Sequence, residues 1–190
     1  MAADLTYRTT QHTGILLLLG MMFILAAASG EPQGNGSVVQ TRAVMSMDAA
    51  HADSPLRIAV LAQISPGYHI NAHKPSLDYL IPTELKLDPG DAFTVKSVVY
   101  PKGTPQKFEF SDVPLAVYEG TLAIGVVLQS GKGVPPGTYT LKGKLGYQAC
   151  NAHACLAPTS APFILNVKVV PRNVALKPVE SNVFERIQFE

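Results

Sequence analysis

From residue 56 to residue 170 the sequence runs in short segments in which apolar and polar residues alternate, with glycine or proline between many of them. The first segment places Ile58, Val60, Ala62 and Ile64 on one side of an extended chain. No helical period interrupts the pattern. Such a region is typical of packed sheets. We therefore predict an all-β domain, an immunoglobulin-like antiparallel β-sandwich, with a small barrel as the alternative.

Turn residues divide this region into strands. Residues 65–67, 88–91 and 130–133 are rich in Gly, Pro, Ser and Asp, which favour tight turns. The β-prone segments are residues 56–64, 68–71, 83–87, 93–100, 107–110, 115–120, 121–128, 137–148 and 163–170.

The N-terminal residues have the pattern of an export signal. Arg8 and His12 precede an apolar run over residues 15–28, and small residues follow up to Gly30. This pattern predicts a secretory signal peptide over residues 1–30, cleaved after Ala28 or after Gly30. The apolar run is shorter than the ~20 residues that span a bilayer as a helix, so an uncleaved anchor is the weaker alternative. We expect an exported protein without stable membrane association.

The remaining sequence is interpreted as one domain with two flanking segments. Residues 31–54 are small and polar enough to predict a flexible N-terminal segment, and residues 55–170 form the predicted sandwich domain. In the C-terminal tail, residues 171–190, Ser181 is positioned to cap a short helix, with disorder as the alternative. Charged residues are 15% of the sequence and the formal net charge is +1, which argues against nucleic acid as a partner.

The two cysteines of the sequence, Cys150 and Cys155, have four residues between them and follow the segment 137–148. In an oxidising compartment two such thiols are expected to pair. The ring they close would stabilise the fold by about 2 kcal/mol, against about 3 kcal/mol for a fifteen-residue loop. A turn-fixing structural disulfide is one interpretation. Reversible redox chemistry is the other, because so small a ring can open without unfolding its host.

Histidines suggest two further interpretations of the cysteine segment. A protonated His153, lying between the cysteines, would stabilise a thiolate, whereas a solvated loop histidine would have no such role. Together with His69 and His73, the set Cys150, His153 and Cys155 would also suit copper or zinc. Against a metal site, His69 and His73 are four residues apart in an extended segment, where that spacing does not place them on one face. A third hypothesis is a protein-interaction domain with an inert disulfide.

Four short motifs resemble a known family. Residues 67–71, 79–83, 147–150 and 155–158, in this order, resemble the N-terminal periplasmic domain of the bacterial thiol-disulfide interchange protein DsbD. The resemblance covers about residues 55–170. It implies a periplasmic, immunoglobulin-like sandwich whose cysteine pair takes electrons from a thioredoxin-like domain and passes them to oxidised periplasmic proteins. Such a domain is a protein-disulfide oxidoreductase of the reductase type and needs no small-molecule cofactor.

The resemblance also implies roles for individual residues. Cys155 would form the mixed disulfide with a partner, and Cys150 would resolve it. The family shields its disulfide with a cap loop that bears an aromatic residue, and Tyr118 in residues 117–120 is the match, with packing in the core or at its rim as the alternative. Glu119 would disfavour a thiolate, unless it is a solvated turn residue. Tyr147 and His153 complete the set of expected tuning residues.

The sequence departs from the family in two ways. The best-known members have one more residue between their cysteines, and they continue into a membrane-spanning electron-transfer domain and a thioredoxin-like domain, whereas this sequence stops at Glu190. A free-standing version would need a separate membrane electron carrier. Expected partners are that carrier and thioredoxin-like redox proteins, including those of cytochrome c biogenesis, and we expect a monomer.

Overall fold

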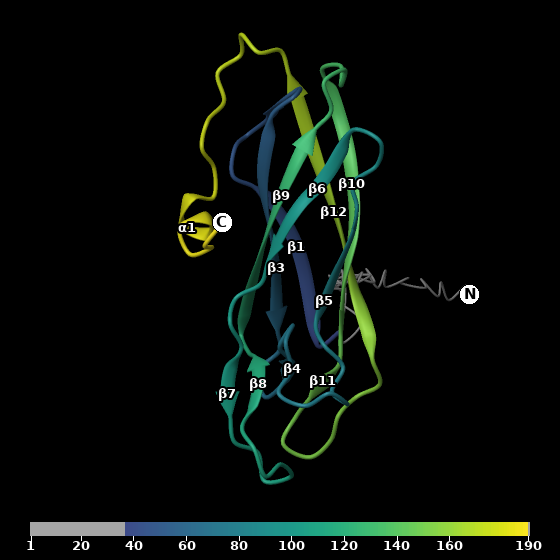
Figure 1. Cartoon of the computed structure of the whole chain (residues 1–190), viewed down its shortest axis with the longest axis vertical. Helices are drawn as coiled ribbons and strands as arrows, with labels where there is room; N and C mark the ends of the chain where they lie inside the picture. Colours follow the sequence, from purple (N-terminus) through teal and green to yellow (C-terminus); the bar gives the residue numbers. More distant parts are fainter. Residues whose placement is uncertain (1–36, 190) are drawn as a thin grey trace, which may run out of the picture. The chain divides into compact units, whose positions relative to one another are not determined.

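The computed structural model describes residues 37–189, and the predicted signal peptide lies outside them. These residues form three four-stranded sheets (Figure 1). The first has the order β1 (Val39–Met45), β3 (Pro55–Ile64), β9 (Thr121–Ser130) and β6 (Phe93–Val99). The second has the order β2 (Ala50–His51), β12 (Thr159–Val170), β10 (Gly137–Tyr147) and β5 (Glu84–Asp88). The third, which we call the small sheet, has the order β11 (Ala149–Cys150), β4 (His69–Asn71), β8 (Leu115–Tyr118) and β7 (Thr104–Gln106).

The predicted all-β immunoglobulin-like sandwich is confirmed. The first two sheets are antiparallel except where the two-residue strand β2 runs parallel to β12. Side chains from both sheets meet in the core, as Val60 and Ile124 of the first sheet do with Leu145 of the second. Burial alternates along most of β12, whereas the central residues of β3 are buried on both faces.

The small sheet adjoins one end of this core. Ile70, Tyr118 and Ala149, one from each of three neighbouring strands, are buried and belong to the same apolar cluster as Val60 and Leu145. The small sheet lies below the first two sheets in the view of Figure 1. Its inner face is therefore anchored by the sandwich core, which leaves its other face to form a site.

The structure corrects two predictions about element boundaries. Residues 39–51, predicted as part of a flexible segment, contain β1 and β2, and β1 pairs with β3 over its whole length. Val39 and Met45 are buried at the two ends of β1, and this burial orders a strand with few large apolar residues. Residues 107–110, predicted as β-prone, form no strand, and β7 lies just before them.

The C-terminal tail packs on the first sheet. The N-cap residue of its helix α1 (Ser181–Phe184) is Glu180, which has φ 53° and makes no side-chain capping bond. The predicted cap at Ser181 is therefore wrong. A Cβ atom built on Gly125 would lie 2.5 Å from Cγ2 of Ile187 and 2.8 Å from Cε1 of Phe189. The tail therefore approaches β9 where glycine leaves room. This helix is too short to cross a membrane, and no other helix occurs between residues 37 and 189.

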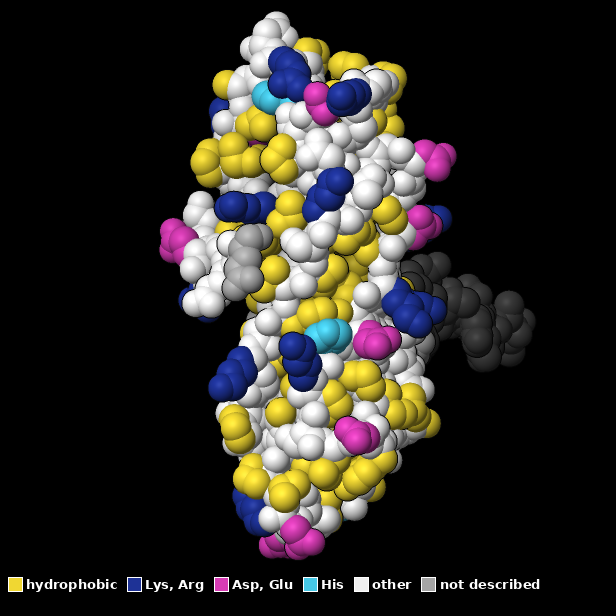
Figure 2. Space-filling model, in the orientation of Figure 1, with side chains coloured by type: hydrophobic (Ala, Val, Ile, Leu, Met, Phe, Trp, Pro, Cys, Tyr) yellow, Lys and Arg dark blue, Asp and Glu magenta, His cyan; other side chains and the backbone are white. Residues whose placement is uncertain are grey.

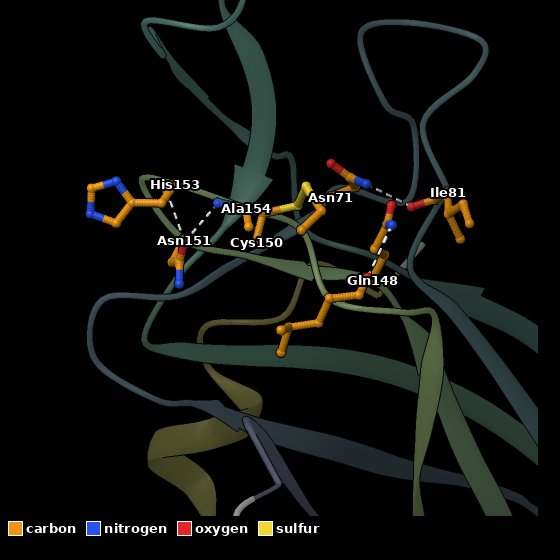
Figure 3. The surroundings of a disulfide bond; sticks show 9 residues. Asn71, Ile81, Gln148, Cys150, Asn151, His153 and Ala154 are labelled. Carbon is orange, nitrogen blue, oxygen red and sulfur yellow. Dashed lines mark hydrogen bonds between the residues drawn. A yellow bond between two sulfur atoms is a disulfide. The ribbon is translucent and has the colours of Figure 1, made fainter.

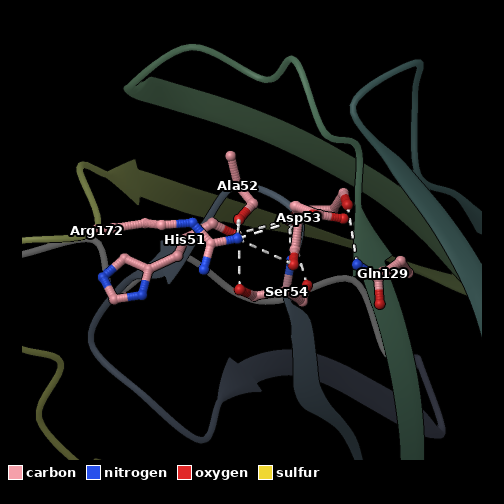
Figure 4. A network of polar contacts seen from close by, with 7 residues as sticks. His51, Ala52, Asp53, Ser54, Gln129 and Arg172 are labelled. Carbon is pink, nitrogen blue, oxygen red and sulfur yellow. Dashed lines mark hydrogen bonds and ion pairs between the residues drawn. The ribbon is translucent and has the colours of Figure 1, made fainter.

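The start of the tail is held by contacts with the residues just before β3. Arg172 donates hydrogen bonds to the backbone oxygens of Ala52 and Asp53, and its guanidinium lies 3.9 Å from the Asp53 carboxylate (Figure 4). Both charged side chains are well exposed, so the ion pair itself contributes little to stability. These contacts fix where the tail leaves β12.

Candidate functional site

Cys150 and Cys155 form the predicted disulfide at the end of β11. Their sulfurs are bonded and their Cα atoms lie 3.9 Å apart. The two sulfurs differ in environment, because Cys150 is 3% exposed as the last residue of β11 whereas Cys155 lies in the exposed loop that follows. One end of the bond is thus accessible and the other is buried.

The loop between the cysteines is held by hydrogen bonds of its own. The Asn151 side-chain oxygen accepts from the backbone N–H groups of His153 and Ala154, each at 2.9 Å (Figure 3). The Leu156 N–H donates to the Ala149 oxygen at 2.8 Å, and the Asn151 N–H donates to the Ala154 oxygen at 3.0 Å. None of these bonds involves sulfur, so the loop has hydrogen bonds of its own in addition to the disulfide.

His153 does not lie between the sulfurs. Its backbone belongs to the Asn151 turn, but its ring is exposed and points away from the disulfide (Figure 3). The geometry gives no support to a thiolate stabilised by His153. Tyr147, the other residue expected to tune the cysteines, is 4% exposed and packs in the sandwich core.

The strand register places one row of chemically active residues beside the disulfide. Cys150 is paired with His69, and Ala149 with Ile70, across β11 and β4. On the other side of β4, Ile70 is paired with Tyr118. Side chains alternate between the two faces of a sheet, so Cys150 and His69 share the face opposite to the core.

Tyr118 therefore faces away from the disulfide. It shares the core face with Ile70, and its hydroxyl donates to the Pro101 oxygen at 2.8 Å and accepts from the His73 N–H at 3.2 Å. Burial raises the pKa of Tyr118, partly offset by its bond to His73. These contacts correspond to the core-packing alternative and not to the cap that the sequence suggested.

Two phenylalanines, Phe108 and Phe110, lie over His69, the residue paired with Cys150. The rings of Phe108 and His69 are stacked with centroids 4.4 Å apart, and Phe110 stacks on Phe108 at 5.2 Å. His69 is only 4% exposed beneath them. Burial lowers the pKa of His69, and the negative charge of Glu119 opposes that effect. The sequence predicts residues 107–110 as β-prone, so it does not indicate that these two phenylalanines form a loop over His69.

Buried polar residues join the segments that carry the family motifs. Gly67, with φ 81°, closes the turn that leads into β4. At the end of β4 the Asn71 side chain donates to the Ile81 oxygen at 2.9 Å, and the Thr83 hydroxyl donates to the Asn71 oxygen. Asn71 and Thr83 are 2% and 0% exposed. Residues 67–71 and 79–83 are thus adjacent in space, and they fix the loop that flanks the disulfide (Figure 3).

The residues considered for a metal site do not converge. His73 stacks on Tyr100 with ring centroids 3.7 Å apart, and its Nδ1 lies 3.1 Å from the Thr83 oxygen. Both cysteines are bonded to each other. Within residues 37–189 no group of three or more His, Cys, Asp or Glu side chains is arranged to hold a metal ion. The metal hypothesis is not supported.

Comparison with known proteins identifies a family and solved structures that resemble this chain. Residues 36–166 match the family described as "Thiol:disulfide interchange protein DsbD, N-terminal". Among solved structures, the N-terminal periplasmic domain of ScsB from Proteus mirabilis is 16% identical with a TM-score of 0.47, and the alignment covers 70% of this chain and 47% of that one. The chain thus spans about half the length of that ScsB domain.

Two structures from Neisseria meningitidis are also similar. The reduced DsbD N-terminal domain is 23% identical with a TM-score of 0.38, covering 65% of this chain and 86% of that one. The same domain in complex with the PilB N-terminal domain is 23% identical with a TM-score of 0.37, covering 69% and 89%. No curated protein matches the sequence significantly.

Proposed function

Because the chain belongs to the family of DsbD N-terminal domains, we propose that it is a periplasmic thiol-disulfide exchange module. In this proposal the Cys150–Cys155 pair receives electrons from a thioredoxin-like or membrane donor and passes them to oxidised periplasmic proteins. The observation that carries the proposal is the asymmetry of the disulfide. An exposed sulfur is open to a partner, and a buried sulfur next to it is positioned to displace that partner.

The exchange then follows from the two environments. In the reduced protein the Cys155 thiolate attacks one sulfur of the partner's disulfide, and the partner's other sulfur leaves with the electron pair. Cys150 then attacks Cys155, the intramolecular disulfide forms again, and the partner is released with both sulfurs reduced. Two electrons have moved from the cysteine pair to the partner. We expect the hydrogen bonds of the Asn151 turn to support the loop in both redox states, because none of them involves sulfur.

Exposed apolar residues of the loops that adjoin the small sheet support docking of another protein. Most of the large hydrophobic side chains that are exposed within residues 37–189 come from the three loops that follow β4, β7 and β11. They are Tyr79, Ile81, Phe110, Val113 and Leu156. Hydrophobic side chains gather at this end on the face shown in Figure 2. Exposed apolar loops next to the sheet that carries the disulfide suit a transient protein partner, and we propose a thioredoxin-like protein.

Cysteine variants test the roles directly. The variant Cys150→Ser should trap a mixed disulfide between Cys155 and a thioredoxin-like partner, visible on a non-reducing gel and in the mass spectrum. The matched variant Cys155→Ser should trap none, because its remaining thiol is buried. Trapping through Cys150 would reverse the assignment. Failure of the reduced parent to transfer electrons to any disulfide would favour the hypothesis of an interaction domain with an inert disulfide.

A further inference from the structure

His69 is a buried titratable residue for which the exchange described above has no use, yet it is adjacent to the buried cysteine. His69 and Cys150 are directly opposed across β4 and β11. Directly opposed residues have Cβ atoms about 4.5–5.5 Å apart on the same face of a sheet. The imidazole therefore lies beside the Cys150 side chain.

Glu119 lies on the β8 side of His69. The β4–β8 register pairs Ile70 with Tyr118, the last residue of β8, and the exposed Glu119 follows Tyr118 just as His69 precedes Ile70. Electrostatics agrees with this placement, because the charge of Glu119 acts on the pKa of His69. The thiol and imidazole groups thus lie on neighbouring strands, and the carboxylate lies just past the end of the next strand.

The loop 107–114, which carries Phe108, also bears charged side chains. Lys107, Glu109 and Asp112 are exposed, and the Lys107 Nζ donates to the Asp112 backbone oxygen. Phe108 is the residue of this loop that stacks on His69. The imidazole thus has an apolar ring stacked on it and the strand that carries Cys150 beside it, and Glu119 is the carboxylate whose charge acts on it.

The resolving step needs a proton acceptor at this position. A thiol attacks a disulfide as the thiolate, and a thiol in apolar surroundings keeps its proton. Cys150 is 3% exposed, so water has little access to remove that proton. A neutral imidazole in the next strand can take it, and a carboxylate beyond the imidazole stabilises the imidazolium that results.

We propose that His69 accepts the proton of the Cys150 thiol during resolution of the mixed disulfide, and that Glu119 stabilises the protonated ring. This inference rests on the proposed function. The Cys150 S–H bond breaks and its proton moves to a ring nitrogen of His69. The Cys150 thiolate attacks the Cys155 sulfur, the Cys150–Cys155 bond forms, and the bond from Cys155 to the partner breaks. The partner sulfur leaves with the electron pair and takes up a proton, while His69 returns its proton to solvent.

The reaction of the reduced full chain with dithionitrobenzoate, followed by stopped-flow absorbance, separates the two steps. Attack by Cys155 releases a first equivalent of thionitrobenzoate, and resolution by Cys150 releases a second. Thionitrobenzoate leaves without needing a proton, so the second phase reports how Cys150 loses its own. In the parent, the rate of the second phase should stay nearly constant around neutral pH and fall in acid, where His69 is protonated.

Two substitutions of His69 should change the shape of this pH profile. His69→Phe keeps a ring for Phe108 to stack on, and His69→Gln keeps a polar group. In both, the second phase should slow about 10²–10⁴-fold at neutral pH and then rise about tenfold per pH unit, because hydroxide must replace the lost base. Glu119→Gln should slow the second phase less. It should also move the fall of the rate in acid to lower pH, because the charge of Glu119 raises the pKa of His69. His51→Gln, on β2, is the matched histidine control and should keep the parent profile.

The outcomes are distinguishable. If the His69 variants keep the parent pH profile, or if the parent itself speeds up tenfold per pH unit through neutrality, the role of His69 is refuted while the exchange function stands. If Cys155→Ser retains the first phase, the nucleophile assignment of the proposed function fails instead. Should a His69 variant not fold, the profile of the parent alone still decides.

Discussion

Replacing Phe108 with Ala would expose the histidine that lies beside the disulfide. The Phe108 ring is half-buried and stacks on His69 at 4.4 Å and on Phe110 at 5.2 Å. An aromatic pair is worth about 0.5–1.5 kcal/mol beyond its burial, and a fully buried Phe→Ala change costs about 3–5 kcal/mol. For a half-buried ring in a loop we expect the free energy of unfolding to fall by about 1–2 kcal/mol. Urea denaturation measures this loss.

The same variant should also change the titration of His69. Burial is the main cause of the lowered pKa of His69, so removing the ring that covers it should raise that pKa towards the ordinary value of 6.5. NMR titration of the His69 ring protons measures the shift. Phe110→Ala is the matched control, because Phe110 is 57% exposed and stacks on Phe108 but not on His69. An unchanged His69 pKa in Phe108→Ala, or an equal shift in both variants, would refute the shielding argument.

Three other properties can be tested in the same way. Gly125→Ala places a methyl group against Ile187 and Phe189, so it should destabilise the protein by about 1–3 kcal/mol and speed limited proteolysis of the tail, whereas Gly133→Ala, with open space around it, should not. The folded-state pKa of His69 lies below its unfolded value of 6.5, so the unfolded chain binds more protons in that window. The free energy of unfolding should therefore fall as pH drops from 6.5 through the folded pKa, and urea midpoints should show a flatter dependence for His69→Phe. Tyr118→Phe removes the hydrogen bonds to Pro101 and His73, so the free energy of unfolding measured in urea should fall by about 1–3 kcal/mol. If Tyr118 only packs in the core, the rate of disulfide reduction should not change. A changed rate would support a role for Tyr118 as a cap on the disulfide.

The sandwich was predictable because the alternation of apolar and polar residues along its strands is enough to indicate a half-buried sheet. In β3, Ile58, Val60, Ala62 and Ile64 recur with period two, and all are buried as predicted. The neighbouring Ala59 is buried as well, because it pairs with Gly125, which the C-terminal tail covers. That burial depends on residues far away in the sequence, so no local pattern reveals it.

The small sheet was only partly predictable for a related reason. The two-residue strand β11 is too short to have a period, and its pairing with β4 is what places Cys150 beside His69. Without that register, Tyr118 and Glu119 are equally plausible neighbours of the disulfide. The register places Tyr118 on the core face, whereas Glu119, just past the end of β8, is exposed. Spacing identified the cysteine pair, whereas the residues around it depend on tertiary pairing.

The reduction potential of the Cys150–Cys155 pair, measured by equilibration with glutathione or dithiothreitol buffers, tests the exchange function most directly. An exchange module should have a potential within the range of catalytic thioredoxin-like proteins, about −120 to −270 mV, and should be reduced rapidly through the exposed Cys155. A potential below about −300 mV together with slow reduction is typical of a structural disulfide and would contradict the proposed function.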